Sequence, residues 1–287
     1  MTLARAGARL VLMGRNIGRL NTVAESARTS GAPHVLVVEC DFASLVSVRD
    51  ACAEVAKRVA TGELGRLDLV IGNAGLQFND RRSQSADGYE ATFAVNVLAN
   101  HVLIRSLIES ASPAAHFVVV GSGTHFGNTR LVKAPVWASP AVLASAGDGG
   151  APFDAASGAA GQCAYSTSKL GVNYLVHAWQ RQHAGSMRFN IYDPGLMPGT
   201  GLVRTGPAIR QWAWHRVMPA LQLFPGVSTT KNSAEQLTAF GLAHRYPDAR
   251  AAYVEIEKLS HASEASMNPE REQQLWDFCE SVLPDPN

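Results

Sequence analysis

Two side chains with complementary acid–base chemistry, Tyr165 and Lys169, stand four residues apart in the run AYSTSKLGVNYL. In a helix, positions i and i+4 lie on one face, so the phenol and the ammonium can converge. A free tyrosine has a pKa near ~10, and a nearby cation lowers that pKa by stabilising the phenolate. The spacing therefore predicts a proton-transfer pair. An ordinary surface helix is the alternative that this short pattern leaves open.

Five apolar runs alternate with longer helix-like stretches. The predicted strands are Arg9–Gly14, His34–Cys40, Leu67–Gly72, His116–Ser122 and Arg188–Asp193. The predicted helices are Ile17–Thr29, Leu45–Thr61, Gly88–Ser110 and Cys163–His183. Strands that are nearly continuous in Val, Ile and Leu are typical of parallel strands buried on both faces. The alternation predicts an α/β fold with a doubly wound parallel sheet, which binds ligands beyond the carboxyl ends of its strands.

Composition excludes several classes of protein. The 287 residues are 46% hydrophobic and 17% charged, which fits a single domain over residues 1–287. With 25 Lys and Arg against 24 Asp and Glu, and no basic run, we expect no nucleic-acid partner. No apolar run reaches the ~18 residues of a membrane span, and no signal peptide is recognisable, so we expect a cytoplasmic protein. The four cysteines are scattered, and no metal site is expected.

Two segments depart from the strand–helix rhythm. Residues 123–161 are rich in Gly, Ala, Ser and Pro, and we interpret them as an insertion that forms a lid over the site or is disordered. Residues 199–229 carry Trp212, Trp214 and Phe224. This second segment either lines a substrate pocket or forms an ordinary packed helix pair.

Short motifs follow the predicted strands in a fixed order. They are NAG at Asn73–Gly75, Asn96 in FAVNVLANHVL, Ser122 after VVVG, YSTSK at Tyr165–Lys169, and DPG at Asp193–Gly195. Each is common singly, but together and in this order they make the chain resemble the short-chain dehydrogenase/reductase family over nearly its whole length. The resemblance implies a Rossmann-type sheet and an oxidoreductase.

The resemblance also assigns catalytic roles. Tyr165 would pass a proton to or from the substrate oxygen, and Lys169 would lower the pKa of Tyr165 and bind the nicotinamide ribose. Ser122 would hydrogen-bond the substrate carbonyl, and Asn96 would hold a water that links Lys169 to solvent. A serine hydrolase is excluded because its G-x-S-x-G elbow would need glycine where Val120 stands.

The cofactor that the resemblance implies is NADP(H) rather than NAD. Arg15 follows the strand where NADP-preferring members carry a basic residue, and no acid lies beside it to bind the ribose hydroxyl. The other cofactor-binding residues would be Asp41, Asn73, Ala74, Gly75, Tyr165, Lys169, Pro194, Gly195 and Thr200.

One part of the family pattern is not recognisable. The family opens with a strand and a glycine-rich turn that holds the pyrophosphate. The run MTLARAGARLVLMGRN instead resembles the end of the first helix followed by the second strand, so we expect a sheet lacking the family's first strand. A start codon assigned too late, a truncated paralogue, and replacement by another segment remain open.

Within the family, the DPGLMPGTGLVR run and the C-terminal tail 252–283 resemble protochlorophyllide reductases and retinol dehydrogenase-like enzymes. This branch implies a small-molecule substrate with a bulky apolar carbonyl, alcohol or reducible double bond, and it raises the expectation of a homo-oligomer. The competing hypotheses are a non-catalytic dinucleotide-binding or scaffold protein that has lost its phosphate loop, and a fragment that folds only with a partner.

Overall fold

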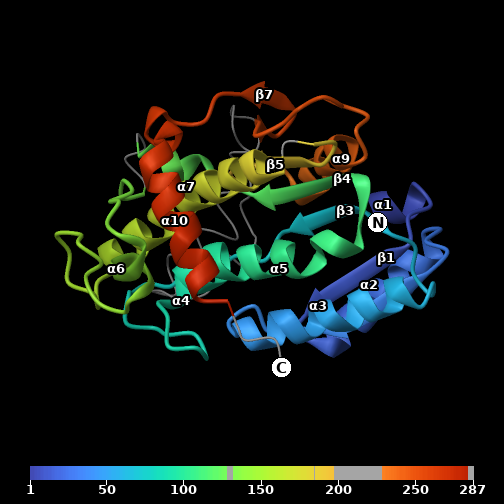
Figure 1. Ribbon diagram of the computed structural model, residues 1–287, viewed down its shortest axis with the longest axis horizontal. Coiled ribbons are helices and arrows are strands. Elements are labelled where there is room, and N and C mark those ends of the chain that lie inside the picture. Colours follow the sequence, from blue (N-terminus) through green and yellow to red (C-terminus); the bar gives the residue numbers. More distant parts are fainter. Residues whose placement is uncertain (128–131, 184, 197–227, 284–287) are drawn as a thin grey trace.

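The computed structural model describes residues 1–127, 132–183, 185–196 and 228–283. Within these residues, the strands form a two-stranded and a five-stranded sheet (Figure 1). The strands are β1 (Leu10–Gly14), β2 (Val35–Glu39), β3 (Leu67–Gly72), β4 (Ala111–Val120), β5 (Arg188–Asp193), β6 (Tyr253–Glu255) and β7 (Lys258–Ser260). β1 pairs with β2 in parallel, and β3 to β6 form a parallel array that β7 extends in the antiparallel direction.

The helices cover both faces of the sheets. They are α1 (Thr2–Arg5), α2 (Ile17–Thr29), α3 (Leu45–Ala60), α4 (Ala91–Phe93), α5 (Ala99–Leu107), α6 (Pro140–Ala144), α7 (Gly158–Gln182), α9 (Thr230–Gly241) and α10 (Pro269–Ser281). Alternate residues of β1 point to opposite faces of the sheet. Val11 and Met13 pack on the larger hydrophobic core, whereas Leu10 and Leu12 pack under α2. This arrangement confirms the predicted α/β fold with a doubly wound sheet.

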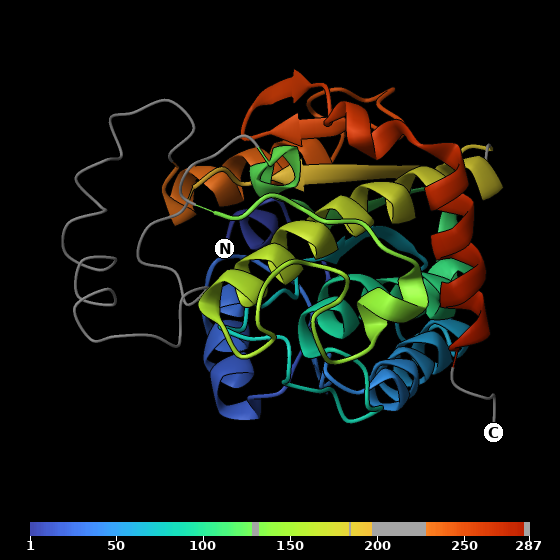
Figure 2. The same ribbon diagram turned by 90° about the vertical axis from the view of Figure 1, so that its left-hand side faces the viewer.

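The large core lies between the sheets and the helices α3, α5 and α7, and α10 crosses the outer side of α5 and α7 (Figure 2). Phe117 and Phe189, which are register partners in β4 and β5, stack with ring centroids 4.9 Å apart. On the opposite face, Val118 and Tyr192 pack with Phe240 of α9. The period of two along β4 therefore divides its side chains between two apolar layers.

Local chemistry explains where the helices begin. Asn16 caps α2 by accepting the Arg19 amide at 2.9 Å, and Ser157 caps α7 through the Ala160 amide at 3.2 Å. Because of this cap, α7 begins five residues before the predicted start at Cys163. The predicted helix from Gly88 begins instead at Ala91, because Gly88 takes a positive φ of 83°.

The expectation of strands buried on both faces is wrong for β1, whose residues are all half-buried. Among the described strands, β1 pairs only with β2, and β3 pairs only with β4, so no ladder joins the two sheets. The remaining predicted strands agree closely with the structure, apart from β4, which begins at Ala111 rather than His116.

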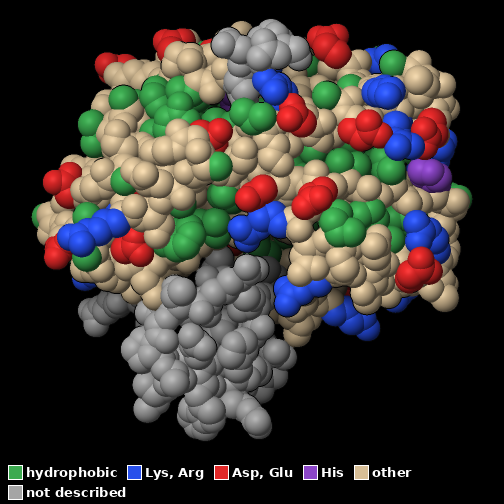
Figure 3. All heavy atoms as spheres, turned by 90° about the horizontal axis from the view of Figure 1, so that it is seen from below, with side chains coloured by type: hydrophobic (Ala, Val, Ile, Leu, Met, Phe, Trp, Pro, Cys, Tyr) green, Lys and Arg blue, Asp and Glu red, His purple; other side chains and the backbone are tan. Residues whose placement is uncertain are grey.

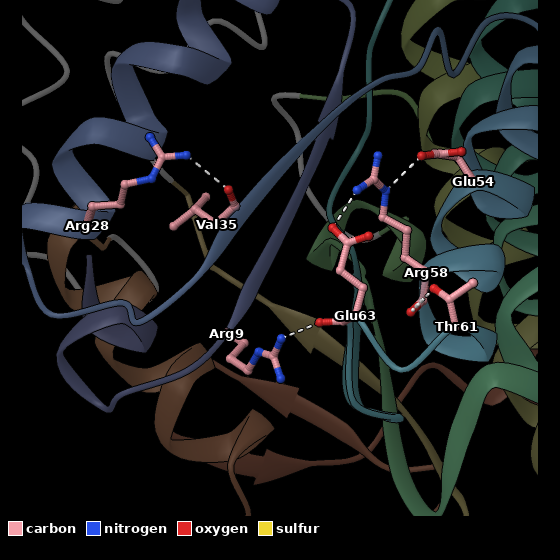
Figure 4. A network of polar contacts seen from close by, with 7 residues as sticks. All are labelled: Arg9, Arg28, Val35, Glu54, Arg58, Thr61 and Glu63. Carbon is pink, nitrogen blue, oxygen red and sulfur yellow. Dashed lines mark hydrogen bonds and ion pairs between the residues drawn. The ribbon is translucent and has the colours of Figure 1, made fainter.

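Polar contacts connect the two sheets near the amino-terminal ends of β1 and β3 (Figure 4). The guanidinium of Arg9, just before β1, donates to the carbonyl of Glu63, just before β3. Arg58 of α3 in turn pairs with the Glu63 carboxylate at 2.5 Å and with Glu54 at 2.7 Å. These contacts connect the β1–β2 unit to the chain that enters β3.

Helical residues Ala91–Ser110 are long and apolar enough to cross a membrane, with a mean hydropathy of 1.4, although no such run was expected from the sequence. In this fold 89% of the apolar 18-residue stretch within Ala91–Ser110 is buried, so α4 and α5 are core helices. On the face shown in Figure 3, acidic and basic side chains of the described residues are interspersed, as the balanced charge suggests.

The described part of the 123–161 segment packs against the body of the protein. Arg81, which is 3% exposed, donates to the carbonyls of Leu143 and Ser145 at 2.9 Å each. Thr167 of α7 accepts the Val136 amide at 3.0 Å. Buried hydrogen bonds of this kind fix the connection against α7.

Candidate active site

Helix α7 brings Tyr165 and Lys169 onto one face, as the spacing predicts, and the two residues are 6% and 4% exposed. The Lys169 ammonium lies 5.7 Å from the centroid of the Tyr165 ring and donates to the Val120 carbonyl at 2.8 Å. The end of β4 therefore holds the ammonium beside the phenol.

Ser122 lies just beyond β4, with its hydroxyl near the hydroxyl of Tyr165, whose pKa it lowers. Its Oγ also accepts two hydrogen bonds from Thr124, at 3.3 Å from the amide and 3.2 Å from the hydroxyl. A serine hydroxyl has two acceptor positions and one proton. Because Thr124 supplies both donors, the Ser122 proton is directed toward Tyr165 and the space where a substrate oxygen would lie.

Asn96 fixes the loop that follows β3. Its Oδ1 accepts the Leu76 amide at 2.9 Å, and its Nδ2 donates to the Leu76 carbonyl at 3.0 Å and to Ser168 Oγ at 2.9 Å. Asn96 lies in the π-helical segment η1 (Ala94–Leu98), a local widening often found at functional sites. The structure thus places Asn96 between the NAG loop and α7, with both ends of its amide occupied by protein groups.

Gly75 of the same loop approaches the proposed catalytic pair closely. A Cβ at this position would lie 3.6 Å from Lys169 Nζ and 3.5 Å from Asn96 Oδ1. The absence of a side chain leaves the backbone of 73–75 open beside the ammonium, so this loop and Lys169 fit the ribose of a nucleotide.

Burial dominates the electrostatics of the pair. It raises the pKa of Tyr165 to about 12, against the lowering effect of the Ser122 hydrogen bond, and Asp193 raises this pKa further. Burial also lowers the pKa of Lys169 to about 8, although Asp193 acts in the opposite direction. Desolvation therefore opposes the charged forms of both residues in the nucleotide-free protein, and the lowering of the Tyr165 pKa by Lys169 stays a prediction.

The sequence interpretation missed two groups at the site, Asp193 and Tyr253. Asp193 ends β5, is 3% exposed, and accepts the Gly195 amide at 2.9 Å. Its other oxygen accepts the hydroxyl of Tyr253 from β6 at 2.5 Å. An acid at the last position of a predicted strand was the available signal for Asp193, whereas nothing local marks Tyr253.

The proposed adenosine-side residues lie together after β1 and β2. Arg15 Nε is 3.6 Å from Asp41 Oδ1, and both side chains are open to solvent at 59% and 44% exposure. Pro194 and Gly195 follow β5, and Gly195 takes a positive φ of 71°. Thr200 lies outside the described residues, as does 199–227 of the predicted substrate-side segment.

Among residues 1–127, 132–183, 185–196 and 228–283, no group of three or more His, Cys, Asp or Glu side chains could hold a metal ion. The four cysteines are buried free thiols. Cys163, two residues before Tyr165, contacts the Ala134 carbonyl at 3.4 Å, and burial raises the pKa of its thiol. It therefore packs as a small apolar residue rather than a reactive one.

A family profile described as short chain dehydrogenase matches residues 1–136. The chain is 43% identical over 110 residues to the putative daunorubicin C-13 ketoreductase of Streptomyces sp. (strain C5), which covers 38% of this chain and 36% of that protein. It is 34% identical to human retinol dehydrogenase 14 over 45% of this chain and 42% of that protein. Rice protochlorophyllide reductase B is 25% identical over 98% of this chain and 72% of its own length.

The protein belongs to the short-chain dehydrogenase/reductase family. Within it, the chain lies near the protochlorophyllide reductases and retinol dehydrogenases, as the sequence predicts. The fold agrees: a putative gluconate 5-dehydrogenase from Beutenbergia cavernae with bound NADP superimposes with a TM-score of 0.63 at 20% identity, over 88% of this chain and 87% of that one. The chain spans 36% and 42% of the length of the ketoreductase and retinol dehydrogenase relatives.

Proposed function

We propose that this short-chain dehydrogenase/reductase transfers hydride between NADP(H) and the carbonyl or alcohol carbon of an apolar small molecule, or a reducible double bond. The observation that carries the proposal is the convergence of Ser122, Tyr165 and Lys169 beyond the end of β4. Ser122 can polarise a substrate oxygen, Tyr165 can protonate it, and Lys169 supplies a nearby cation. This set of groups fits carbonyl reduction.

The protein residues would act in sequence on the substrate oxygen. The Ser122 hydroxyl, whose acceptor positions are filled by Thr124, donates to the carbonyl oxygen and stabilises its developing charge. Tyr165 then gives its proton to that oxygen. Lys169, held by the Val120 carbonyl, favours the phenolate that forms and supports its reprotonation.

The residues present fit the adenosine and nicotinamide ends of a nicotinamide dinucleotide. Arg15 would pair with the 2′-phosphate, Asp41 would contact the adenine, and Asn73, Ala74 and the open backbone of Gly75 would lie along the ribose. Tyr165 and Lys169 would contact the nicotinamide ribose, and Pro194 and Gly195 would lie beside the ring. When bound, NADPH supplies the hydride that reduces the carbonyl carbon.

The names of two relatives guide the substrate class. One relative is named as a putative C-13 ketoreductase of daunorubicin, and another as a reductase of protochlorophyllide. We therefore infer a bulky, largely apolar substrate. We further propose a single catalytic domain over residues 1–287, with 123–161 as an insertion and 199–229 on the substrate side, in a cytoplasmic homo-oligomer.

A non-catalytic dinucleotide-binding protein is the second candidate. It is favoured by the pKa of Tyr165, which burial raises to about 12 and so away from proton exchange at neutral pH. In an enzyme, bound nucleotide and substrate would change the surroundings of Tyr165 and so its pKa. A non-catalytic protein needs no such change, because its tyrosine transfers no proton.

The test is an NADPH titration followed by nucleotide fluorescence, and then turnover with aromatic ketones. Tyr165→Phe is expected to abolish turnover, since general acid–base groups contribute about 10²–10⁴-fold, and to leave NADPH affinity nearly unchanged. Tyr89→Phe, which alters a half-buried tyrosine before α4, serves as the matched control. Comparable turnover by Tyr165→Phe would contradict the mechanism, and NADPH binding without turnover by the unaltered chain would favour the second candidate.

A further inference from the structure

A buried histidine, His125, lies next to the proposed catalytic serine and has no part in the chemistry derived above. It belongs to the short helix η3 (Gly123–Phe126) and is 1% exposed. Its ring packs 4.1 Å from the Phe126 ring and 5.0 Å from the Tyr253 ring, measured between centroids. The residue is therefore enclosed between the end of β4 and strand β6.

Both ring nitrogens of His125 have backbone partners. Nδ1 lies 2.7 Å from the carbonyl oxygen of Ser122, and Nε2 lies 3.1 Å from the amide nitrogen of Ser263. A carbonyl only accepts and an amide N–H only donates, so the ring must be neutral with its proton on Nδ1. Burial supports the neutral form by lowering the pKa of His125, against the raising effects of the Ser122 carbonyl and Asp193.

The second partner, Ser263, belongs to a loop that is fixed to the catalytic helix. The Ser266 amide donates to the Ser263 carbonyl at 2.9 Å, which closes the turn. Tyr174 of α7 then donates its hydroxyl to the Ala265 carbonyl at 2.5 Å. The same helix carries Tyr165, nine residues earlier.

These bonds form a continuous frame. It runs from the Ser122 backbone through the His125 ring to the 263–266 turn, and from that turn to α7. The frame joins the strand end that carries the serine to the helix that carries the tyrosine. A displacement of about 1 Å between such groups can cost about 10²-fold in rate.

We propose that His125 is a positioning residue, which holds the Ser122 backbone at the distance from α7 at which its hydroxyl meets Tyr165 and the substrate oxygen. This inference rests on the proposed oxidoreductase function for its catalytic consequence. The frame itself is a property of the fold and can be tested without turnover.

The first measurement is the tautomer of His125 in the ¹⁵N-histidine-labelled chain, with its signal assigned by its loss in His125→Phe. We expect a neutral ring protonated on Nδ1 at pH 7. The Ser263 amide is expected to be protected from hydrogen exchange, and to lose that protection in His125→Phe. A ring protonated on Nε2 or on both nitrogens, or unchanged Ser263 exchange, would overturn the frame.

The second measurement separates the two hydrogen bonds by kinetics. Phenylalanine keeps the ring packing and removes both bonds, whereas His125→Asn can still donate near the Nδ1 position and His125→Gln can still accept near Nε2. We expect His125→Phe to lower kcat by about 10–10²-fold with NADPH affinity within about twofold, and His125→Asn to recover most of the loss. An unchanged kcat in a cooperatively melting His125→Phe would contradict the positioning role.

The two proposals fail in different ways. If the unaltered chain binds NADPH but turns over no carbonyl compound, the proposed function fails, and the tautomer and the Ser263 exchange still decide the frame. If Tyr165→Phe abolishes turnover while His125→Phe does not change it, the oxidoreductase proposal stands and the inference about His125 falls.

Discussion

The hydroxyl of Tyr253, the first residue of β6, donates to Oδ2 of Asp193, the last residue of the adjacent parallel strand β5, at 2.5 Å. Both residues are buried, at 2% and 3% exposure, and the other carboxylate oxygen accepts the Gly195 amide. The negative charge of Asp193 raises the pKa values of both Tyr165 and Lys169. The Asp193–Tyr253 contact therefore holds in place a carboxylate that adds to the effect of burial on Tyr165 and opposes it on Lys169.

Asp193→Asn should move the pH profile of carbonyl reduction. The substitution removes the charge and keeps an oxygen for the Gly195 amide. Without the carboxylate, the pKa values of Tyr165 and Lys169 fall, so the proton donor is lost at lower pH. We expect the alkaline fall in kcat to shift toward lower pH.

Tyr253→Phe is the matched control for this prediction, because it removes the hydroxyl contact and leaves the charge of Asp193 in place. In Tyr253→Phe, we expect the alkaline fall in kcat to occur at the same pH as in the unaltered protein or at a higher pH. If Asp193→Asn leaves the pH of the alkaline fall in kcat unchanged, the carboxylate does not act on Tyr165 and Lys169.

Lys169→Met should change how stability depends on pH. Burial lowers the pKa of Lys169 from 10.5 to about 8, so the unfolded chain binds one more proton than the folded chain between these values. Stability of the unaltered protein therefore rises with pH across this window, and the variant lacks that contribution. The difference in unfolding free energy between the two proteins should change by roughly 3 kcal/mol between pH 7 and pH 10.5.

Urea unfolding of both proteins at pH 7, 8.5 and 10.5 measures this difference. Loss of the hydrogen bond to the Val120 carbonyl lowers the unfolding free energy of the variant by the same amount at each of the three pH values, because that carbonyl does not titrate. A difference that stays constant across the series would mean that Lys169 is not desolvated in the folded protein.

The sequence predicted the parts of the site that depend on neighbouring residues. Helical spacing placed Tyr165 and Lys169 on one face, and the strand–motif order placed Ser122 beside them. The pKa directions could not be predicted in this way, because the desolvation that decides them comes from packing by distant segments.

Contacts between distant residues explain what the sequence interpretation missed. Asp193 and Tyr253 are 60 residues apart, and His125 and Ser263 are 138 apart. Strands β6 and β7 have only three residues each, too short to show a period of two. β6 pairs with β5, and β7 pairs with β6, and this pairing brings Tyr253 and the chain that leads to Ser263 to the site.

Asn96→Ala should weaken both the fold and nucleotide binding. The amide of Asn96 satisfies both backbone groups of Leu76 and contacts Ser168. Each buried polar group left without a partner costs about 1–3 kcal/mol, so the unfolding free energy should fall by roughly 2–4 kcal/mol. The loop 73–75 would also lose its fixed position beside Lys169, so NADPH affinity should fall.

Asn100→Ala is the control, since Asn100 lies one turn further along and bonds the Asn96 carbonyl rather than the loop. We expect it to lower stability while NADPH affinity changes little. Equal NADPH affinities of the two variants, measured by nucleotide fluorescence, would show that Asn96 does not act through the loop.

Arg15→Ala should alter the choice between NADPH and NADH. Arg15 is exposed after β1, and its contact with Asp41 at 3.6 Å is an open surface pair whose loss costs little stability. Charge-assisted hydrogen bonds to a 2′-phosphate are worth more, so NADPH affinity should fall about tenfold, or about 1.4 kcal/mol, with NADH affinity unchanged. Arg19→Ala removes an exposed arginine four residues further along, in α2, and should change neither affinity. Parallel losses of NADPH and NADH affinity in Arg15→Ala would assign Arg15 to a part of the nucleotide that both cofactors share.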